Sequence, residues 1–171
     1  MKDTIVKIGG SSLSSARNVS NAANIIVEHY LGNISSGLNV VISAFGVEPG
    51  GRKEDKVTDR LISVADYTVQ GNINGALGEI ERVKTIYYTI TDALKLERAI
   101  VDGNFKSLEE LVLSSIRDLE GGASLNRKKM IDAIATFGEL TSTPVVAEVV
   151  QKKLETRFQA VNYCGLKHHS V

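Results

Sequence analysis

A lysine followed closely by two glycines and two serines is the segment of this 171-residue chain with the clearest potential for chemistry. It comprises Lys7, Gly9, Gly10, Ser11 and Ser12. Glycines let backbone N–H groups approach an anion closely, and the serine hydroxyls add hydrogen-bond donors. A helix that follows would direct the positive end of its dipole at the same anion. The segment therefore indicates a phosphate-binding loop, with an ordinary β-turn behind an exposed lysine as the structural alternative.

The order of these residues excludes two familiar phosphate-binding loops. In a Walker A loop the lysine follows the glycines and precedes Ser or Thr, whereas here Lys7 comes first. The chain also contains no G-x-G-x-x-G dinucleotide fingerprint. A phosphate site at this position would thus belong to another class.

Three further polar side chains could receive a carboxylate or an ammonium group. Ser43 follows an apolar run and Thr58 stands at the expected start of a helix, so both could present a hydroxyl beside free backbone N–H groups. Glu139, directly after Gly138, could accept hydrogen bonds from an ammonium group. The structural alternatives are a turn at Ser43, a helix cap at Thr58 and a favourable helix-dipole interaction at Glu139.

Two short apolar runs would position the first of these segments. Residues 5–8 precede the glycines, residues 38–42 precede Ser43, and a helical pattern ending at Gly32 lies between them. This strand, helix, strand order is typical of a parallel sheet, and the continuous second run predicts a strand buried on both faces. Because ligands bind at the carboxyl ends of parallel strands, the segments after both strands are expected to meet.

The middle of the chain is expected to leave the sheet. A helix should begin with Thr58 as its N-cap. Residues 73–119 then carry apolar residues at helical spacing in two stripes, interrupted near residues 102–103. This pattern predicts a helical excursion of two helices.

The last third of the chain is expected to return to the sheet. Residues 127–136 predict one helix, and a second should begin at about Thr143, because Pro144 is tolerated only in a first helical turn. That helix should end at about residue 154. Residues 157–163 predict a third strand.

Composition limits the classes of function. Twenty Lys and Arg balance twenty Asp and Glu, so no overall positive field favours nucleic acid or an anionic membrane as a partner. The longest uncharged run, residues 29–47, contains glycines and polar residues and predicts no membrane span. The first residues lack the pattern of a secretory signal, and a single cysteine, Cys164, fits a reducing compartment. We expect a cytoplasmic protein.

Taken in order, four motifs resemble those of the aspartate kinases, members of the amino acid kinase superfamily. They are Lys-Ile-Gly-Gly-Ser-Ser-Leu at 7–13, Val-Val-Ile-Ser-Ala-Phe-Gly at 40–46, Val-Thr-Asp-Arg-Leu-Ile at 57–62 and Phe-Gly-Glu-Leu-Thr-Ser at 137–142. The helical excursion before the last motif is similar to that of aspartate kinases rather than to the shorter acetylglutamate, glutamate or uridylate kinases. The resemblance implies an α/β fold, a three-layer sandwich with a mainly parallel sheet of the amino acid kinase or carbamate kinase type.

The resemblance also implies a reaction. Aspartate kinases transfer the γ-phosphoryl group of ATP, bound with Mg²⁺, to the side-chain carboxylate of L-aspartate, the first step of lysine, threonine and methionine biosynthesis. The implied phosphate-binding residues are Lys7, Gly9, Gly10 and Ser11, and the implied aspartate-binding residues are Ser43, Thr58 and Glu139. Lys7 would neutralise charge on the transferring group, and Glu139 would take the ammonium group. No metal-ligating residue is implied.

Residues 1–171 are therefore expected to form the N-terminal part of one amino acid kinase domain. The nucleotide-binding half and the ACT regulatory domains that usually follow are expected to be absent. The tail from Cys164 does not resemble the family, and with His168 and His169 it offers too few ligands for a zinc site. Two alternatives stay open: a non-catalytic remnant or assembly module of the same fold, and a sister kinase with another acceptor. A homo-oligomer is expected.

Overall fold

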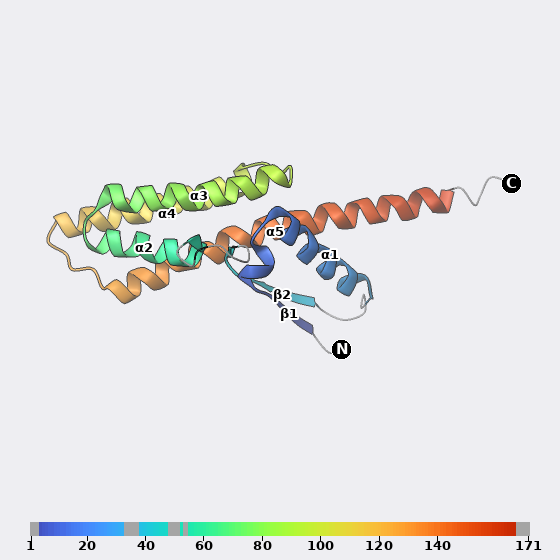
Figure 1. Cartoon of the computed structure of the whole chain (residues 1–171), viewed down its shortest axis with the longest axis horizontal. Coiled ribbons are helices and arrows are strands. Elements are labelled where there is room, and N and C mark those ends of the chain that lie inside the picture. The colour runs from blue at the N-terminus through green and yellow to red at the C-terminus, as the bar shows by residue number, and fades with distance from the viewer. Residues whose placement is uncertain (1–3, 33–37, 48–51, 53–54, 167–171) are drawn as a thin grey trace.

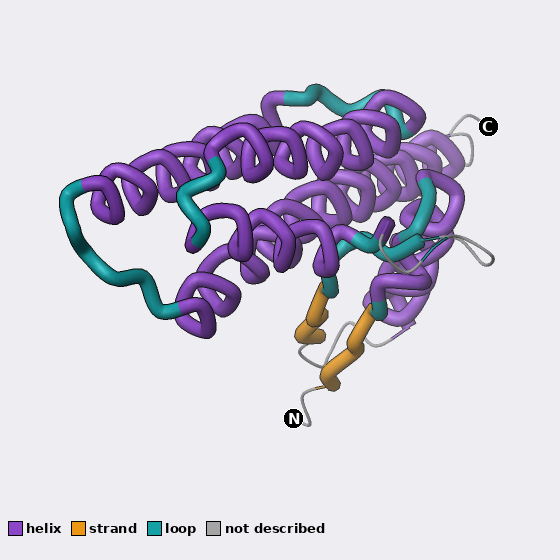
Figure 2. Tube along the Cα trace, turned by 60° about the vertical axis from the view of Figure 1, so that its left-hand side comes forward, coloured by secondary structure: helices purple, strands orange, loops and turns teal. Residues whose placement is uncertain are grey.

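The protein is mostly helical and carries one small parallel sheet (Figures 1 and 2). The computed structural model describes residues 4–32, 38–47, 52 and 55–166, with side chains up to residue 157. The elements are β1 (Thr4–Ile8), a 3-10 turn η1 (Gly10–Leu13), α1 (Ala16–Gly32), β2 (Leu38–Ile42), α2 (Val57–Val69), α3 (Ile73–Ala93), α4 (Ala99–Glu120) and α5 (Arg127–Leu166). No helix within these described ranges is long and apolar enough to cross a membrane.

The predicted strand, helix, strand unit is confirmed. β1 and β2 pair in parallel, in a register that runs from Thr4 opposite Leu38 to Ile8 opposite Ile42, and α1 connects them. The prediction that β2 is buried on both faces is wrong for the described residues. Ile5 is 71% exposed and Val41 is 49% exposed, and both lie on the same uncovered face of the sheet.

The two helices predicted over residues 73–119 are confirmed, as α3 and α4. Together with α2 and the first half of α5 they form a bundle beside the sheet (Figures 1 and 2). The expected interruption at residues 102–103 is wrong, because the turn lies at residues 94–98 and Asp102 belongs to the first turn of α4. Lys95 makes this turn with a φ of 55°, the left-handed conformation that ends many helices. Asp102 suits its new position, since a carboxylate in a first turn complements the helix dipole.

α5 is a single helix of 40 residues that passes through Pro144 without interruption. The expected new start beside this proline is therefore wrong. Proline has no N–H to donate to the carbonyl of Leu140, and that carbonyl instead accepts a hydrogen bond of 3.1 Å from Nδ2 of Asn104 on α4. The strand expected at residues 157–163 is also wrong, because α5 continues through them. A short apolar run does not by itself separate strand from helix.

Candidate functional site

A cavity of about 360 Å³ lies where the ends of β1 and β2 meet the start of α2 and the middle of α5. These segments contribute residues 10–11, 43–47, 56, 58 and 139. The residues that line the cavity are Gly10, Ser11, Ser43, Ala44, Phe45, Gly46, Val47, Lys56, Thr58 and Glu139. They include five of the seven residues that the resemblance implied for phosphate and aspartate binding.

The loops after the two strands cross at very close range. The N–H of Gly46 donates a hydrogen bond of 2.9 Å to the carbonyl of Gly10. A Cβ atom on Gly46 would lie 2.5 Å from that carbonyl oxygen, and a Cβ on Gly10 would lie 2.7 Å from the carbonyl oxygen of Ala44. Both positions therefore require glycine, because any side chain would push the two backbones apart. This contact fixes the floor of the cavity.

The structure brings part of the predicted phosphate-binding loop, Gly10 and Ser11, to the cavity. In η1 the first internal bond runs from the N–H of Ser12 to the carbonyl of Gly9 at 3.0 Å, so the N–H groups of Gly10 and Ser11 have no acceptor within the turn. Gly9 has an extended backbone, and a Cβ there would meet nothing within 4 Å. Neither Gly9 nor Lys7 lines the cavity, although both come shortly before the lining residues Gly10 and Ser11 in the sequence.

Lys7 lies on the exposed face of the sheet, opposite Val41. The cation that lines the cavity is Lys56, which sequence reasoning missed. Lys56 is the N-cap residue of α2 and makes no capping bond with its side chain. Thr58 was expected as this cap but lies inside the first turn, with its side chain exposed. The only feature of the sequence that could have indicated a role for Lys56 is its position directly before the Val-Thr-Asp motif.

Glu139 reaches the cavity because α5 packs closely on the loop after β2. A Cβ atom on Gly138 would lie 2.7 Å from Cβ of Ala44 and 3.3 Å from Cδ1 of Leu61. Only a residue without a side chain allows the helix to come this near. The glycine before Glu139 is therefore a packing position that lets α5 lie against the loop after β2.

Tyr87 of α3 contacts both the loop after β2 and α5. Its ring stacks on Phe45 with 4.6 Å between centroids. Its hydroxyl donates to the carbonyl of Gly138 at 2.7 Å and lies 2.9 Å from Oγ of Ser142, which contacts the same carbonyl at 2.7 Å. Burial raises the pKa of Tyr87 well above its ordinary value, although the contact with Ser142 opposes this, so the phenol stays protonated. Sequence reasoning assigned Tyr87 only to an apolar stripe.

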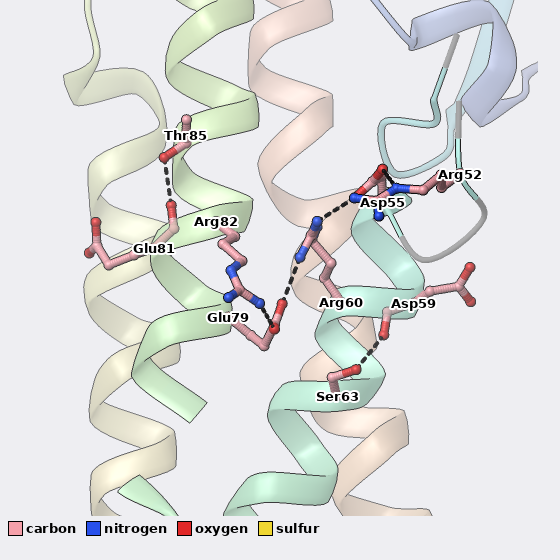
Figure 3. Close-up of polar contacts among 9 residues, drawn as sticks. All are labelled: Arg52, Asp55, Asp59, Arg60, Ser63, Glu79, Glu81, Arg82 and Thr85. Carbon is pink, nitrogen blue, oxygen red and sulfur yellow. Dashed lines mark hydrogen bonds and ion pairs between the residues drawn. The ribbon is translucent and has the colours of Figure 1, made fainter. Parts of the chain in front are cut away.

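A network of ion pairs fixes the start of α2 against α3 (Figure 3). Arg60, in the Val-Thr-Asp-Arg motif, pairs with Asp55 at 2.5 Å and with Glu79 at 2.9 Å. Glu79 also pairs with Arg82, and Asp55 pairs with Arg52 at 3.2 Å. Desolvation alone would raise the pKa of Asp55, but the two guanidinium groups outweigh it and hold this pKa below its ordinary value. The network positions the backbone that carries the cavity residues of α2.

The described residues that line the cavity combine one cation, one carboxylate and three hydroxyls. Lys56 and Glu139 supply the opposite charges, and Ser11, Ser43 and Thr58 supply the hydroxyls. A ligand with an ammonium group and a carboxylate would find a partner for each charge here. The arrangement therefore suits a small zwitterion better than a simple anion.

Within the part of the chain that the structure describes, no group of three or more His, Cys, Asp or Glu side chains could hold a metal ion. In comparisons with known proteins, no family model and no curated protein matches the chain. A functional assignment therefore depends on the order of the motifs and on the geometry of this cavity.

Proposed function

We propose that the chain carries the aspartate site and part of the γ-phosphate site of an aspartate kinase with the three-layer amino acid kinase fold. One observation supports this most. Gly10, Ser11, Ser43, Thr58 and Glu139, selected by their resemblance to family motifs in four separate segments, line a single cavity. Gly10, Ser11 and Ser43 follow two paired parallel strands and would lie together for that reason alone, so the meeting of these loops with Thr58 of α2 and Glu139 of α5 is the informative part.

In this proposal the cavity binds L-aspartate as a zwitterion. Glu139 accepts hydrogen bonds from the ammonium group, and the hydroxyls of Ser43 and Thr58 donate to the α-carboxylate. The side-chain carboxylate is then directed at the loop that contains Gly10 and Ser11, where the γ-phosphate of ATP would be bound. Aspartate would thus be oriented by its backbone groups and would react through its side chain.

The reaction needs little acid or base chemistry from the protein. A side-chain carboxylate oxygen of aspartate forms a bond to the γ-phosphorus, the bond from that phosphorus to the β,γ-bridging oxygen breaks, and ADP leaves. The carboxylate is already ionised, so no general base has to remove a proton. The protein must instead align two anions and neutralise their charges. Mg²⁺ would arrive with the phosphates, and no described residue is assigned to it.

Two lysines are candidates for the neutralising cation. The family resemblance favours Lys7, at the end of β1, and the cavity geometry favours Lys56, which lines the site directly. Lys7 stands one residue before the last residue of β1, beside the phosphate loop in sequence but on the exposed sheet face. Lys7→Ala and Lys56→Ala, compared at equal protein concentration, separate the two roles.

Aspartyl phosphate formation tests the proposal. The purified chain is incubated with Mg-ATP and L-aspartate, and the acyl phosphate is trapped as its hydroxamate, with D-aspartate and L-glutamate as controls. Product formed only with L-aspartate, and lost in Glu139→Gln, supports the kinase. Product formed equally well with L-glutamate would instead favour a sister kinase with another acceptor.

A second candidate is a non-catalytic or assembly module of the same fold. The uncovered sheet face with Ile5 and Val41 favours it, because parallel sheets are normally covered on both faces. Binding of L-aspartate without formation of hydroxamate would favour this second candidate. A homo-oligomer that covers these side chains would favour it further.

A further inference from the structure

A second cavity, of about 440 Å³, lies between α1, α5 and the turn that joins α3 to α4. It shares no residue with the candidate aspartate site. We name it the α1–α5 groove. Its lining residues are Ser20, Asn24, Leu94, Leu96, Val149, Lys152, Lys153, Thr156 and Arg157.

One wall of the groove is a cationic face of α5. Val149, Lys152, Lys153 and Thr156 are spaced as i, i+3, i+4 and i+7, so they lie on the same side of the helix. Arg157 adds a third cation one residue later. Among the described residues, those that line the groove include no carboxylate. The lining itself is therefore positively charged, although the whole chain has a formal net charge of zero and two of these cations have a carboxylate partner outside the groove lining.

The three cations are not equally available to a ligand. Arg157 pairs with Glu28 of α1. Nζ of Lys152 lies 3.8 Å from Oε1 of Glu148 and donates a hydrogen bond of 3.4 Å to the carbonyl of Lys95. Among the described residues, Lys153 has no carboxylate within ion-pair distance. An anion in the groove would thus be bound first by Lys153.

The other walls offer polar donors and an apolar surface. Ser20 and Asn24 are four residues apart on α1 and so share one face, and neither side chain makes a hydrogen bond to another described residue. Leu94, Leu96 and Val149 supply the apolar part. The combination of a few polar groups with apolar walls, in a volume of this size, is typical of small-molecule sites.

We propose that the α1–α5 groove binds a small organic anion, a phosphate or carboxylate group attached to an apolar body. Lys153 and Lys152 bind the charged group, Ser20 and Asn24 donate hydrogen bonds to it, and Leu94, Leu96 and Val149 cover the apolar body. This assignment is independent of the proposed kinase function, because the two cavities have no residue in common.

Phenyl phosphate is a suitable probe, since it joins a phosphate to an apolar ring. The full chain, labelled with ¹⁵N, is titrated in buffer with about 0.15 M salt, where weak attraction between exposed charges is largely screened. Two controls are titrated in parallel: inorganic phosphate, which lacks the apolar ring, and benzyl alcohol, which lacks the phosphate. We expect saturable shifts of the amides of Ser20, Asn24 and Lys153 with phenyl phosphate, at lower concentration than with either control.

Lys153→Gln is the test variant, and Lys128→Gln is its matched control, because Lys128 is an exposed lysine of the same helix outside the groove. Loss of one charged hydrogen bond should weaken phenyl phosphate binding about tenfold or more in Lys153→Gln and leave binding by Lys128→Gln unchanged. Lys153→Arg should retain most of the affinity. The ¹⁵N spectrum of each variant also verifies that it is folded.

Three results would overturn the proposal. The first is no saturable shift at the groove. The second is equal binding by both glutamine variants. The third is shifts confined to Gly10 and Ser11, which would place the anion in the candidate phosphate loop instead.

Discussion

The hydroxyl of Tyr87 provides a direct test of how the candidate site is held together. Tyr87→Phe removes only this oxygen and preserves the ring that stacks on Phe45. The hydroxyl makes two contacts, to the carbonyl of Gly138 and to Ser142, and the tyrosine is fully buried. After the substitution Ser142 still contacts the Gly138 carbonyl, so this acceptor is not left without a donor.

The expected decrease in the free energy of unfolding follows from these contacts. A buried hydrogen bond contributes about 0.5–1.5 kcal/mol net, so two of them give a destabilisation of about 1–3 kcal/mol. For a chain of 171 residues, 1 kcal/mol lowers the Tm by about 2–4 °C, so Tyr87→Phe should melt roughly 2–12 °C below the parent protein. The amide resonances of Gly138 and Glu139 should shift as well.

Tyr88→Phe is the matched control for this measurement. Tyr88 is the next residue of α3 and also donates a hydrogen bond, of 2.6 Å, to Asp102, but that contact is at the surface. Its loss should cost less than about 0.5 kcal/mol. Urea unfolding of both variants gives the comparison. Equal destabilisation by the two substitutions would refute the view that Tyr87 is the buried polar link between α3 and α5.

Three further predictions concern the site and its supports. Gly46→Ala should destabilise the protein by more than about 2 kcal/mol, because its Cβ would clash with the backbone of Gly10. Gly9→Ala, whose Cβ would meet nothing within 4 Å, should cost less than about 1 kcal/mol. Urea unfolding measures both free energies. Asn104→Ala should cost about 1 kcal/mol in the same assay, because it removes the donor to the carbonyl that the proline of α5 leaves unpaired. The hydrogen bond from Arg98 holds the pKa of Asp92 below 3.8, so the stability it contributes should be present at neutral pH and be lost as the pH falls below that value. The unfolding midpoints of Asp92→Asn and the parent should therefore converge in acid, and a constant difference would contradict this.

Apolar patterns within a segment correctly predicted several helices and strands. The apolar run at 38–42 matches β2, and the two helical stripes match α3 and α4. The error at Pro144 occurred where a distant residue contributes to the outcome, whereas the strand expected at 157–163 was wrong because a short apolar run fits strand and helix alike. Where α5 passes through Pro144, the carbonyl of Leu140 accepts its hydrogen bond from Asn104, which lies 36 residues before Leu140 on another helix. No local pattern around the proline contains that information.

The same distinction applies to the site. Ser43, Thr58 and Glu139 were found because they stand at element ends or inside motifs, and the fold brings them to one cavity. Lys56 and Tyr87 were missed, because their importance depends on which surface they meet after folding. Lys7 shows the converse, since a sequence position beside a phosphate loop does not ensure that the side chain enters the cavity.

The central claim is that Glu139, Ser43 and Thr58 form a site for L-aspartate. Titration of the ¹⁵N-labelled chain with L-aspartate, and separately with D-aspartate, tests it without requiring nucleotide. Glu120→Gln, at an exposed glutamate at the end of α4, is the control for Glu139→Gln. The account predicts saturable shifts around Ser43, Thr58 and Glu139 with the L isomer, weakened about tenfold or more in Glu139→Gln and unchanged in Glu120→Gln. Equal shifts with both isomers, or an unaltered affinity in Glu139→Gln, would contradict it.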